Sequence, residues 1–387
     1  MKPAAAPAPA AARTPAAAPP AEGAPNAHAP SQHGHELTPR RAVRDRAGLN
    51  RTAGLALAVV AVFAASVLLG TYTVTIPDFF KILAAHLTSG ERIPGASFIV
   101  MEHKLPRAVV GTLIGAAFGL SGALFQTMLR NPLASPDVIG ISYGASAAAV
   151  TAIVVFGASG AVVSGAAFAG ALGVAALIYA ISRSGSLGSG GRRGDAAGSR
   201  LILAGVGIAA ALHSVVSFLL TRADIRVAAD VLIWLNGSLN SATWERAGIL
   251  GLTLIVLVPA VGLLAGPLRI LELGDDTAAG LGVRVNAARL AIVITAVGLS
   301  AAATAAAGPV AFVAFLAGPI ARRFVRKASL PASALAGVLI VLSADFFAAN
   351  IAPLLLGGTV LPVGVVTGAL GAPFLLWLLV TSNRKDA

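Results

Sequence analysis

Apolar stretches long enough to cross a lipid bilayer recur along most of the sequence. A hydrocarbon core about 30 Å thick requires about 20 residues of α-helix, and irregular backbone is tolerated there only where protein or water satisfies it. We count ten such stretches, of which the eighth is too short to cross in a straight line. They cover residues 53–71, 106–128, 138–157, 160–182, 201–221, 247–266, 289–307, 309–321, 331–352 and 362–381. The sequence therefore predicts an all-α, polytopic membrane protein with about ten transmembrane helices.

The composition supports this interpretation and excludes several classes of protein. Hydrophobic residues make up 57% of the chain and charged residues only 11%, whereas soluble domains contain about 25% charged residues. An ordinary cytosolic enzyme is therefore excluded. The chain has no cysteine, which excludes disulfides, zinc–thiolate sites and cysteine-ligated iron–sulfur clusters.

The net charge of +12 reflects membrane topology rather than a nucleic-acid partner. Cytoplasmic loops of membrane proteins are enriched in Lys and Arg. When the N-terminus is placed inside, 21 of the 28 basic residues fall on the cytoplasmic side of the ten stretches. We therefore expect both termini in the cytoplasm, a multi-pass location in the cell (cytoplasmic) membrane, and no nucleic-acid partner.

The N-terminal segment differs in composition from the rest of the chain. Residues 1–50 contain nine prolines, many alanines and few large apolar side chains, so burial cannot offset the entropy lost on ordering. We expect residues 1–50 to be a disordered cytoplasmic tail and residues 51–387 to form the ten-helix membrane domain.

The eighth stretch is interrupted, and it follows a weak internal repeat. Pro309, Gly318 and Pro319 break its helical pattern, which is tolerated where the freed backbone faces protein or a water-filled cavity. The Gly-Leu-Ser run at 119–121 recurs at 298–300, and each run is followed by a Pro-containing connection. The charge distribution gives the two helices opposite directions, so we expect an inverted-repeat core of the kind that transporters use.

The sequence lacks the groups that would let this chain convert energy by itself. A phosphate-binding P-loop requires a Gly-Lys pair, and none of the five lysines follows a glycine. His213 and Asp345 are the main ionisable residues within the stretches, which is little material for ion coupling. No helix-spaced cluster of His, Asp and Glu indicates a metal site or intramembrane hydrolysis. We expect neither a catalytic residue nor a bound metal.

Two external segments are long enough to have structure of their own. Residues 76–83 form an amphipathic pattern with Pro77 in the first turn, which predicts a short helix at the membrane interface. The second segment contains Trp234 and Trp244. Tryptophan is enriched at the level of the lipid headgroups, and we interpret both residues in that way.

One cytoplasmic segment has the pattern of a short capped helix. Asp275 is placed to cap a helix of about one and a half turns, and Gly282 is placed to end it. Such an element could dock in a groove of a soluble partner and transmit its motion. A simple capped connector between two spans is the alternative.

Several motifs in this chain resemble one protein family. They are Leu105–Arg107, Gly119–Gln126, Asn131–Gly140, Ser199–Gly205, Trp234–Leu239, Leu273–Val283 and Leu361–Gly368. In this order they resemble the permease subunits of bacterial iron-siderophore and cobalamin ABC importers of the FecCD-like type, over residues 55–381. Three positions depart from the family pattern: Ala349 replaces an Arg, Val360 replaces a Glu, and Gly318-Pro319 shifts a proline by one residue.

The resemblance implies a transport subunit rather than an enzyme. Two ABC ATPase subunits would hold ATP and Mg²⁺, and this chain would bind no cofactor. A second permease copy or paralogue and an extracytoplasmic siderophore-binding protein would complete the assembly. The pattern at Trp234–Leu239 favours a ferric siderophore as cargo, with cobalamin or haem as alternatives. An ion-gradient-driven secondary transporter is the alternative from another class.

The resemblance also implies roles for individual residues. Within a coupling loop at about residues 268–288, the ATPase contacts would be Leu273, Gly274, Asp275, Asp276, Thr277, Ala278, Gly280, Leu281, Gly282 and Val283. Asn131 and Leu133 match a cytoplasmic gate in the loop after the second span, and Ser199 matches a gate before the fifth. Lys104 and Arg107 match basic positions that meet acidic groups on the binding protein.

Overall fold

The computed structural model describes residues 37–70, 72–88, 95–137, 140–184 and 193–383. The chain divides into two compact units, Met1–Arg46 and Ala47–Ala387. The first helix, α1, begins at Leu37. Residues 37–50 are therefore helical, although we expected them to belong to a disordered tail, and residues 1–36 of that tail lie outside the described residues. All further description concerns the second unit.

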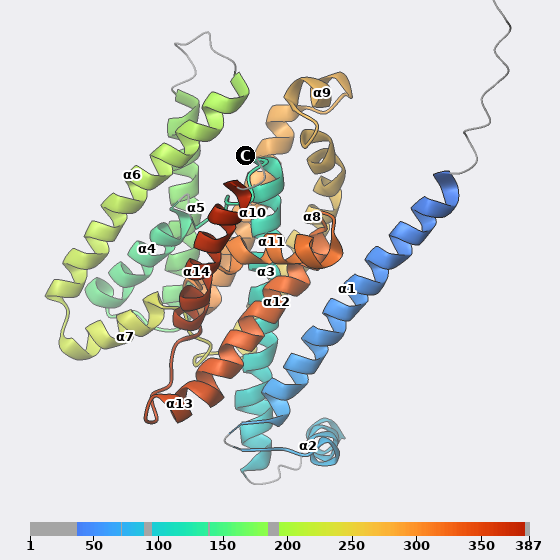
Figure 1. Cartoon of the computed structure of the whole chain (residues 1–387). Coiled ribbons are helices and arrows are strands. Elements are labelled where there is room, and N and C mark those ends of the chain that lie inside the picture. The colour runs from blue at the N-terminus through green and yellow to red at the C-terminus, as the bar shows by residue number, and fades with distance from the viewer. Residues whose placement is uncertain (1–36, 71, 89–94, 138–139, 185–192, 384–387) are drawn as a thin grey trace, which may run out of the picture. The chain divides into compact units, whose positions relative to one another are not determined.

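Every regular element in the described ranges is a helix (Figure 1). The elements are α1 (Leu37–Leu68), α2 (Ile76–Thr88), η1 (Phe98–Lys104), α3 (Leu105–Met128), α4 (Ile141–Phe156), α5 (Ala161–Ser184), α6 (Arg193–Arg222), α7 (Ile225–Leu235), α8 (Trp244–Leu271), α9 (Asp275–Gly280), α10 (Val285–Ala307), α11 (Val313–Val325), α12 (Leu330–Phe346), η3 (Phe347–Ile351), α13 (Ala352–Leu355) and α14 (Val363–Asn383).

Each of the ten apolar stretches coincides with a helix. Among the described residues, seven helices are long and apolar enough to cross a membrane. The apolar helices at 141–156 and 363–378 are shorter, and α11 has 13 residues. The all-α, multi-pass membrane architecture is therefore confirmed, whereas the count of ten spans stays a prediction.

The short helix expected near residue 76 is present as α2. Its first turn is fixed by Thr75, whose hydroxyl accepts from the backbone N–H of Asp78 at 3.3 Å and donates to the Asp78 carboxylate at 2.6 Å. This reciprocal pair satisfies a backbone donor that the helix itself leaves free. The helix is confirmed, and its position at a membrane interface stays a prediction.

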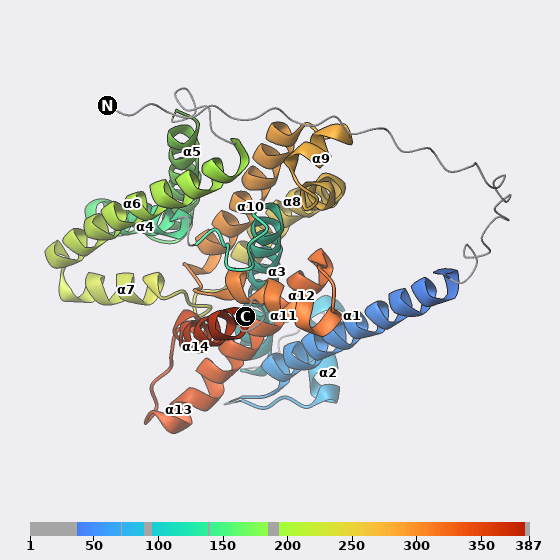
Figure 2. The same cartoon turned by 45° about the horizontal axis from the view of Figure 1, so that its top comes forward.

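Helix α3 is the centre of the core, with α8 and α10 on one side and α11 and α12 on the other (Figure 2). Glycines allow its close approach to α12. A Cβ atom at Gly119 would lie 2.2 Å from the Ser333 carbonyl oxygen, and one at Gly115 would lie 2.5 Å from the Val338 Cα. A Cβ at Gly337, on α12, would in turn lie 2.1 Å from the Gly115 carbonyl oxygen. Small residues at a spacing of four let membrane helices pack backbone to backbone, as they do here.

The proline-interrupted helix α11 is completed by a side chain from α3. Pro319 has no N–H, so the Phe315 carbonyl loses its normal donor four residues ahead. The buried Gln126 supplies the missing donor, because its Nε2 lies 3.0 Å from the Phe315 carbonyl oxygen. Its Oε1 accepts from Arg322 Nη2 at 2.7 Å. The carbonyl freed by Pro319 therefore faces protein, which is one of the two surroundings expected for such a break.

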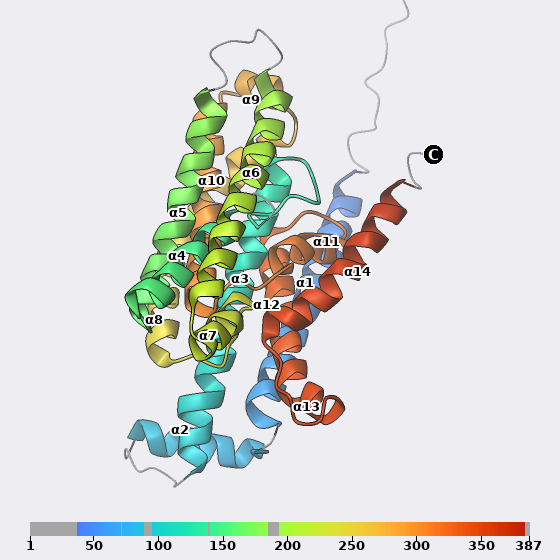
Figure 3. The ribbon, with the colours of Figure 1, turned by 90° about the vertical axis from the view of Figure 1, so that its left-hand side faces the viewer.

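Helices α4, α5 and α6 pack against one another beside this core (Figure 3). Helix α5 joins them to the core through its contacts with α10. In α6 much of the apolar surface is exposed, including Leu203 and Phe218. In a membrane protein such a surface faces lipid or another membrane subunit rather than water.

Candidate functional site

Helix α9 forms a short capped element at one end of the second unit (Figure 1). We expected Asp275 to cap it, and this was wrong: Gly274, with φ +109°, is the cap, and Asp275 is the first helical residue. Gly282 ends the element as expected. Its φ is +83°, its N–H donates to the Ala279 carbonyl, and the Val283 N–H donates to the Ala278 carbonyl, both at 3.0 Å. This pair of hydrogen bonds around a left-handed residue is a common way for a helix to end.

The α9 segment presents an exposed face. Leu273 is 64% exposed and Leu281 is 60% exposed, while Ala278, within the helix, is fully buried. Asp276, Thr277 and Gly280 are exposed between the two leucines. Exposed leucines beside acidic residues make a surface suited to a protein partner.

The Asp275 carboxylate joins α9 to two other parts of the chain. Its Oδ1 lies 2.7 Å from Arg289 Nη2, on α10, and 3.3 Å from Arg130 Nη2, after the end of α3. The sequence reasoning missed this connection. Basic residues near the same membrane edge were evident, but the charge pattern does not specify which of them reaches Asp275.

The loop that follows α3 contains two of the expected gate residues. The Asn131 side-chain oxygen accepts from the Leu133 N–H at 2.8 Å, which makes a compact turn around Pro132. Asn131 is exposed and Leu133 is half-buried. The structure thus brings the expected gate loop and the expected coupling helix together through Arg130 and Asp275. Ser199 lies within α6, and its side chain is outside the described residues.

Lys104 and Arg107 lie at the opposite end of α3 from this loop. The 24 residues of α3 correspond to a helix about 36 Å long. Lys104 Nζ donates to the carbonyl oxygens of Leu69 and Tyr72, at 2.8 and 2.6 Å, and so holds the end of α1 against the start of α3.

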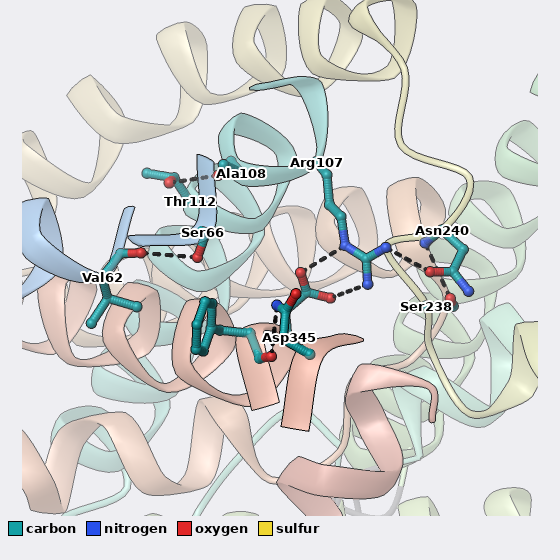
Figure 4. A network of polar contacts seen from close by, with 10 residues as sticks. Val62, Ser66, Arg107, Ala108, Thr112, Ser238, Asn240 and Asp345 are labelled. Carbon is teal, nitrogen blue, oxygen red and sulfur yellow. Dashed lines mark hydrogen bonds and ion pairs between the residues drawn. The ribbon is translucent and has the colours of Figure 1, made fainter. Parts of the chain in front are cut away.

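Arg107 ties three segments together (Figure 4). Its Nε and Nη2 contact the two carboxylate oxygens of Asp345, on α12, at 2.7 and 2.8 Å. Its Nη1 contacts the Asn240 side-chain oxygen at 2.8 Å. The side chains of Arg107 and Asp345 are only 14% and 8% exposed. Asp345 has no basic neighbour in the sequence, and the structure supplies one 238 residues away.

Near Asn240, three segments of the chain are in backbone contact at glycine residues. A Cβ at Gly237 would lie 2.5 Å from the Pro309 carbonyl oxygen, and one at Gly308 would lie 2.2 Å from the Trp234 carbonyl oxygen. A Cβ at Gly364 would lie 1.9 Å from the Asn236 carbonyl oxygen. The α7–α8 connection, the α10–α11 connection and the start of α14 are therefore held backbone to backbone, with no room for side chains.

The two tryptophans of this region have internal contacts. Trp244 Nε1 donates to the Met101 carbonyl at 2.6 Å and so anchors α8 to the segment before α3. Trp234 is half-buried and lines a cavity of about 280 Å³ together with Asp230, Asn240 and Arg246. This cavity is at the lower limit of about 300 Å³ for small-molecule pockets. Placement of the tryptophans at headgroup level stays a prediction.

Within the residues that the structure describes, no group of three or more His, Asp or Glu side chains could hold a metal ion. The polar clusters described above are instead ion pairs and hydrogen bonds between helices. Their geometry joins segments to one another and leaves Leu273 and Leu281, on either side of α9, exposed.

Comparison with known families identifies the chain. The FecCD transport family matches residues 57–381. This chain belongs to that family. Curated members include the ferric enterobactin permease FepG of Escherichia coli, which is 38% identical over 76% of this chain and 86% of its own length. The Fe(3+)-citrate permease YfmE of Bacillus subtilis is also 38% identical, over 75% of this chain and 84% of its own length.

The fold of this FecCD member also matches a solved structure, described as a metal-chelate type ABC transporter in an inward-facing conformation. The TM-score is 0.70, with 24% sequence identity, over 85% of this chain and 98% of that one. At the three positions that depart from the family pattern, Ala349 lies in η3, Val360 is half-exposed in the connection to α14, and Gln126 donates to the carbonyl that Pro319 leaves without its helical donor.

Proposed function

We propose that this chain is the permease subunit of an ABC importer that moves a ferric siderophore across the cytoplasmic membrane. The observation that carries the proposal is the family match over residues 57–381, joined by relatives named for ferric enterobactin and Fe(3+)-citrate. The energy source would be two partner ATPase subunits that hold ATP and Mg²⁺. A second permease copy or paralogue and an extracytoplasmic siderophore-binding protein would complete the complex.

The experiment is uptake of radioactive iron chelates into vesicles that contain the complete complex. We expect uptake to require ATP, to stop with a hydrolysis-deficient ATPase subunit and to persist with a protonophore. Uptake that survives the deficient ATPase but stops with the protonophore would instead establish a secondary transporter. Competition by cobalamin or haem, but not by ferric siderophores, would reassign the cargo within the family.

The residues from Leu273 to Val283 are proposed as the ATPase-docking surface. Support comes from the two exposed leucines and the exposed Asp276. Asp276→Arg should weaken ATPase binding to the purified permease. Asp78→Arg makes the same charge change on α2, where the side chain is also exposed, and should leave ATPase binding unaltered. Equal binding by both variants would remove α9 from the interface.

Asn131 and Leu133 are proposed as one cytoplasmic gate and Ser199 as another. Small and amide side chains permit a passage to close without binding a large polar chelate tightly. Bulkier side chains at Asn131 and Ser199 should slow release of cargo into the vesicle lumen. Uptake at the wild-type rate by Asn131→Trp would contradict the assignment of that residue.

Lys104 and Arg107 are proposed to orient the binding protein through its acidic groups. Such contacts influence encounter and orientation more than affinity. Since Arg107 is also bound to Asp345, its two roles have to be separated. Arg107→Gln removes the positive charge. Asp345→Asn breaks the ion pair but keeps the positive charge of Arg107. Docking should weaken with Arg107→Gln and Lys104→Gln, more at low salt than at high salt, and persist with Asp345→Asn. Equal loss with Arg107→Gln and Asp345→Asn would leave Arg107 a purely internal role.

A further inference from the structure

We infer that Arg130 is a positioning residue that transmits movement of α9 to the gate loop through its ion pair with Asp275. The inference rests on the proposed function, in which α9 contacts the ATPase and Asn131 and Leu133 form the gate. It assigns to Arg130 a role that neither the sequence motifs nor the comparisons give it. Three observations support it.

The first observation is the backbone of Arg130, which has φ +50°. Its N–H donates to the Thr127 carbonyl at 3.2 Å, and the next N–H donates to the Gln126 carbonyl at 3.1 Å. This is the pattern that ends α9 at Gly282. Glycine is the usual residue there because a side chain is disfavoured in the left-handed conformation. Arg130 holds this conformation at a cost, as Arg326 does with φ +61°, and what distinguishes Arg130 is that its side chain reaches Asp275.

The second observation is the arrangement of charges around Asp275. Arg289 and Arg130 share the same carboxylate oxygen, at 2.7 and 3.3 Å. The Arg289 pair is shorter, and the Arg289 side chain is 28% exposed, against 46% for Arg130. Arg289 thus anchors α9 to α10, whereas the Arg130 contact is the weaker and more solvated one. A contact that forms and breaks at little cost suits a moving connection better than a buried pair does.

The third observation is a hydrogen bond within the loop beyond Arg130. Asn131 follows directly in the chain, and its side chain holds the Leu133 N–H at 2.8 Å around Pro132. Because this hydrogen bond ties the two residues, a displacement of Arg130 would move Asn131 and Leu133 together. The same pair works in both directions, so cargo in the gate would also bias the position of α9.

The decisive variant is Arg130→Gly in the complete complex in vesicles. Glycine fits φ +50° better than arginine does, so the variant keeps the loop backbone and loses only the side chain. We expect cargo moved per ATP hydrolysed to fall about fivefold, because uptake falls more than hydrolysis does. Arg130→Lys should keep most of the wild-type ratio and Arg130→Gln should lose it.

Arg326→Gly is the matched control. Arg326 follows the end of α11 with φ +61°, and none of the ion pairs between described residues joins it to α9. If cargo moved per ATP falls equally for Arg326→Gly and Arg130→Gly, Arg130 acts only as a positive charge near a helix C-terminus. That result would overturn the inference. So would a wild-type ratio for both Arg130→Gly and Arg130→Gln. Absence of ATP-driven uptake by the wild-type complex would instead overturn the proposed function.

Discussion

Replacement of Gln126 by leucine should destabilise the helix bundle, because Gln126 completes a broken helix. Leucine has a similar volume, so the change removes hydrogen bonds with little change in packing. It would leave the buried Phe315 carbonyl, now 3.0 Å from Gln126 Nε2, without a donor. It would also remove the acceptor of Arg322, now at 2.7 Å.

The expected size of the effect follows from these two contacts. A buried carbonyl without a partner costs about 1–3 kcal/mol, and loss of a hydrogen bond to a charged group costs about 1.5–3 kcal/mol. The second term is reduced here because Arg322 is half-buried and can regain water. We therefore expect Gln126→Leu to lower the free energy of unfolding by about 2–4 kcal/mol.

The assay is equilibrium unfolding of the purified permease in mixed micelles, followed by tryptophan fluorescence. Thr112→Val, also on α3, is the matched control. Among the described residues, the Thr112 hydroxyl bonds only the Ala108 carbonyl of its own helix, at 2.8 Å, so its loss should cost less than about 1 kcal/mol.

A second substitution tests the cause directly. Pro319→Ala restores an N–H that can donate to the Phe315 carbonyl. Gln126→Leu should then cost about 1–2 kcal/mol less in the Pro319→Ala background than in the wild type. If the two substitutions are additive, or if Gln126→Leu is as stable as the wild type, Gln126 does not compensate for Pro319 and the reasoning is refuted.

Three further predictions concern stability. Gly119→Ala should lower the free energy of unfolding by about 1–3 kcal/mol through overpacking, whereas Gly165→Ala, with open space around its Cβ position, should be neutral or slightly stabilising; equal effects in thermal unfolding would contradict the close helix contact. Asp345→Ala should cost about 2–4 kcal/mol because it leaves Arg107 buried without its partner, and much of this should return in the double variant with Arg107→Met; chemical unfolding of both variants measures this. Burial raises the pKa of Asp137, and a hydrogen bond from Ser142 offsets part of this rise. The contribution of Asp137 to stability is therefore greatest below the ordinary pKa of an aspartate and is lost as the pH rises through the raised pKa. The stability of Asp137→Asn should fall less than that of the wild type between pH 4 and pH 7, and identical pH profiles would contradict the raised pKa.

Local signals in the sequence predicted the helices well and the contacts between them poorly. Glycine at 282 ended α9 because a left-handed residue is needed there, which is a property of a few neighbouring residues. The capping residue was placed one position too late, because Asp275 is a favourable cap by type but is engaged in ion pairs instead. Its partners Arg130 and Arg289 lie 145 and 14 residues away.

The candidate site was predicted as separate motifs, and their connections were not. Lys104 and Arg107 were identified as basic positions, but their contacts with Leu69, Tyr72 and Asp345 were not foreseen. Helices that are apolar on all sides carry little periodic signal that distinguishes the buried face from the lipid face. The sequence therefore does not show which face of such a helix is buried. Without that information, no contact between helices can be assigned.

The sequence by itself determined that most of this chain lies in lipid, where its long apolar helices fall and the family to which it belongs. Those properties depend on the length and polarity of continuous segments and on motifs read in order. Only the tertiary structure decided that Gln126 completes α11, that Arg107 binds Asp345 and that Arg130 reaches Asp275. Each of these contacts joins residues more than 100 positions apart. A polar group buried in an apolar bundle must find a partner, but only the packing of the helices determines which one.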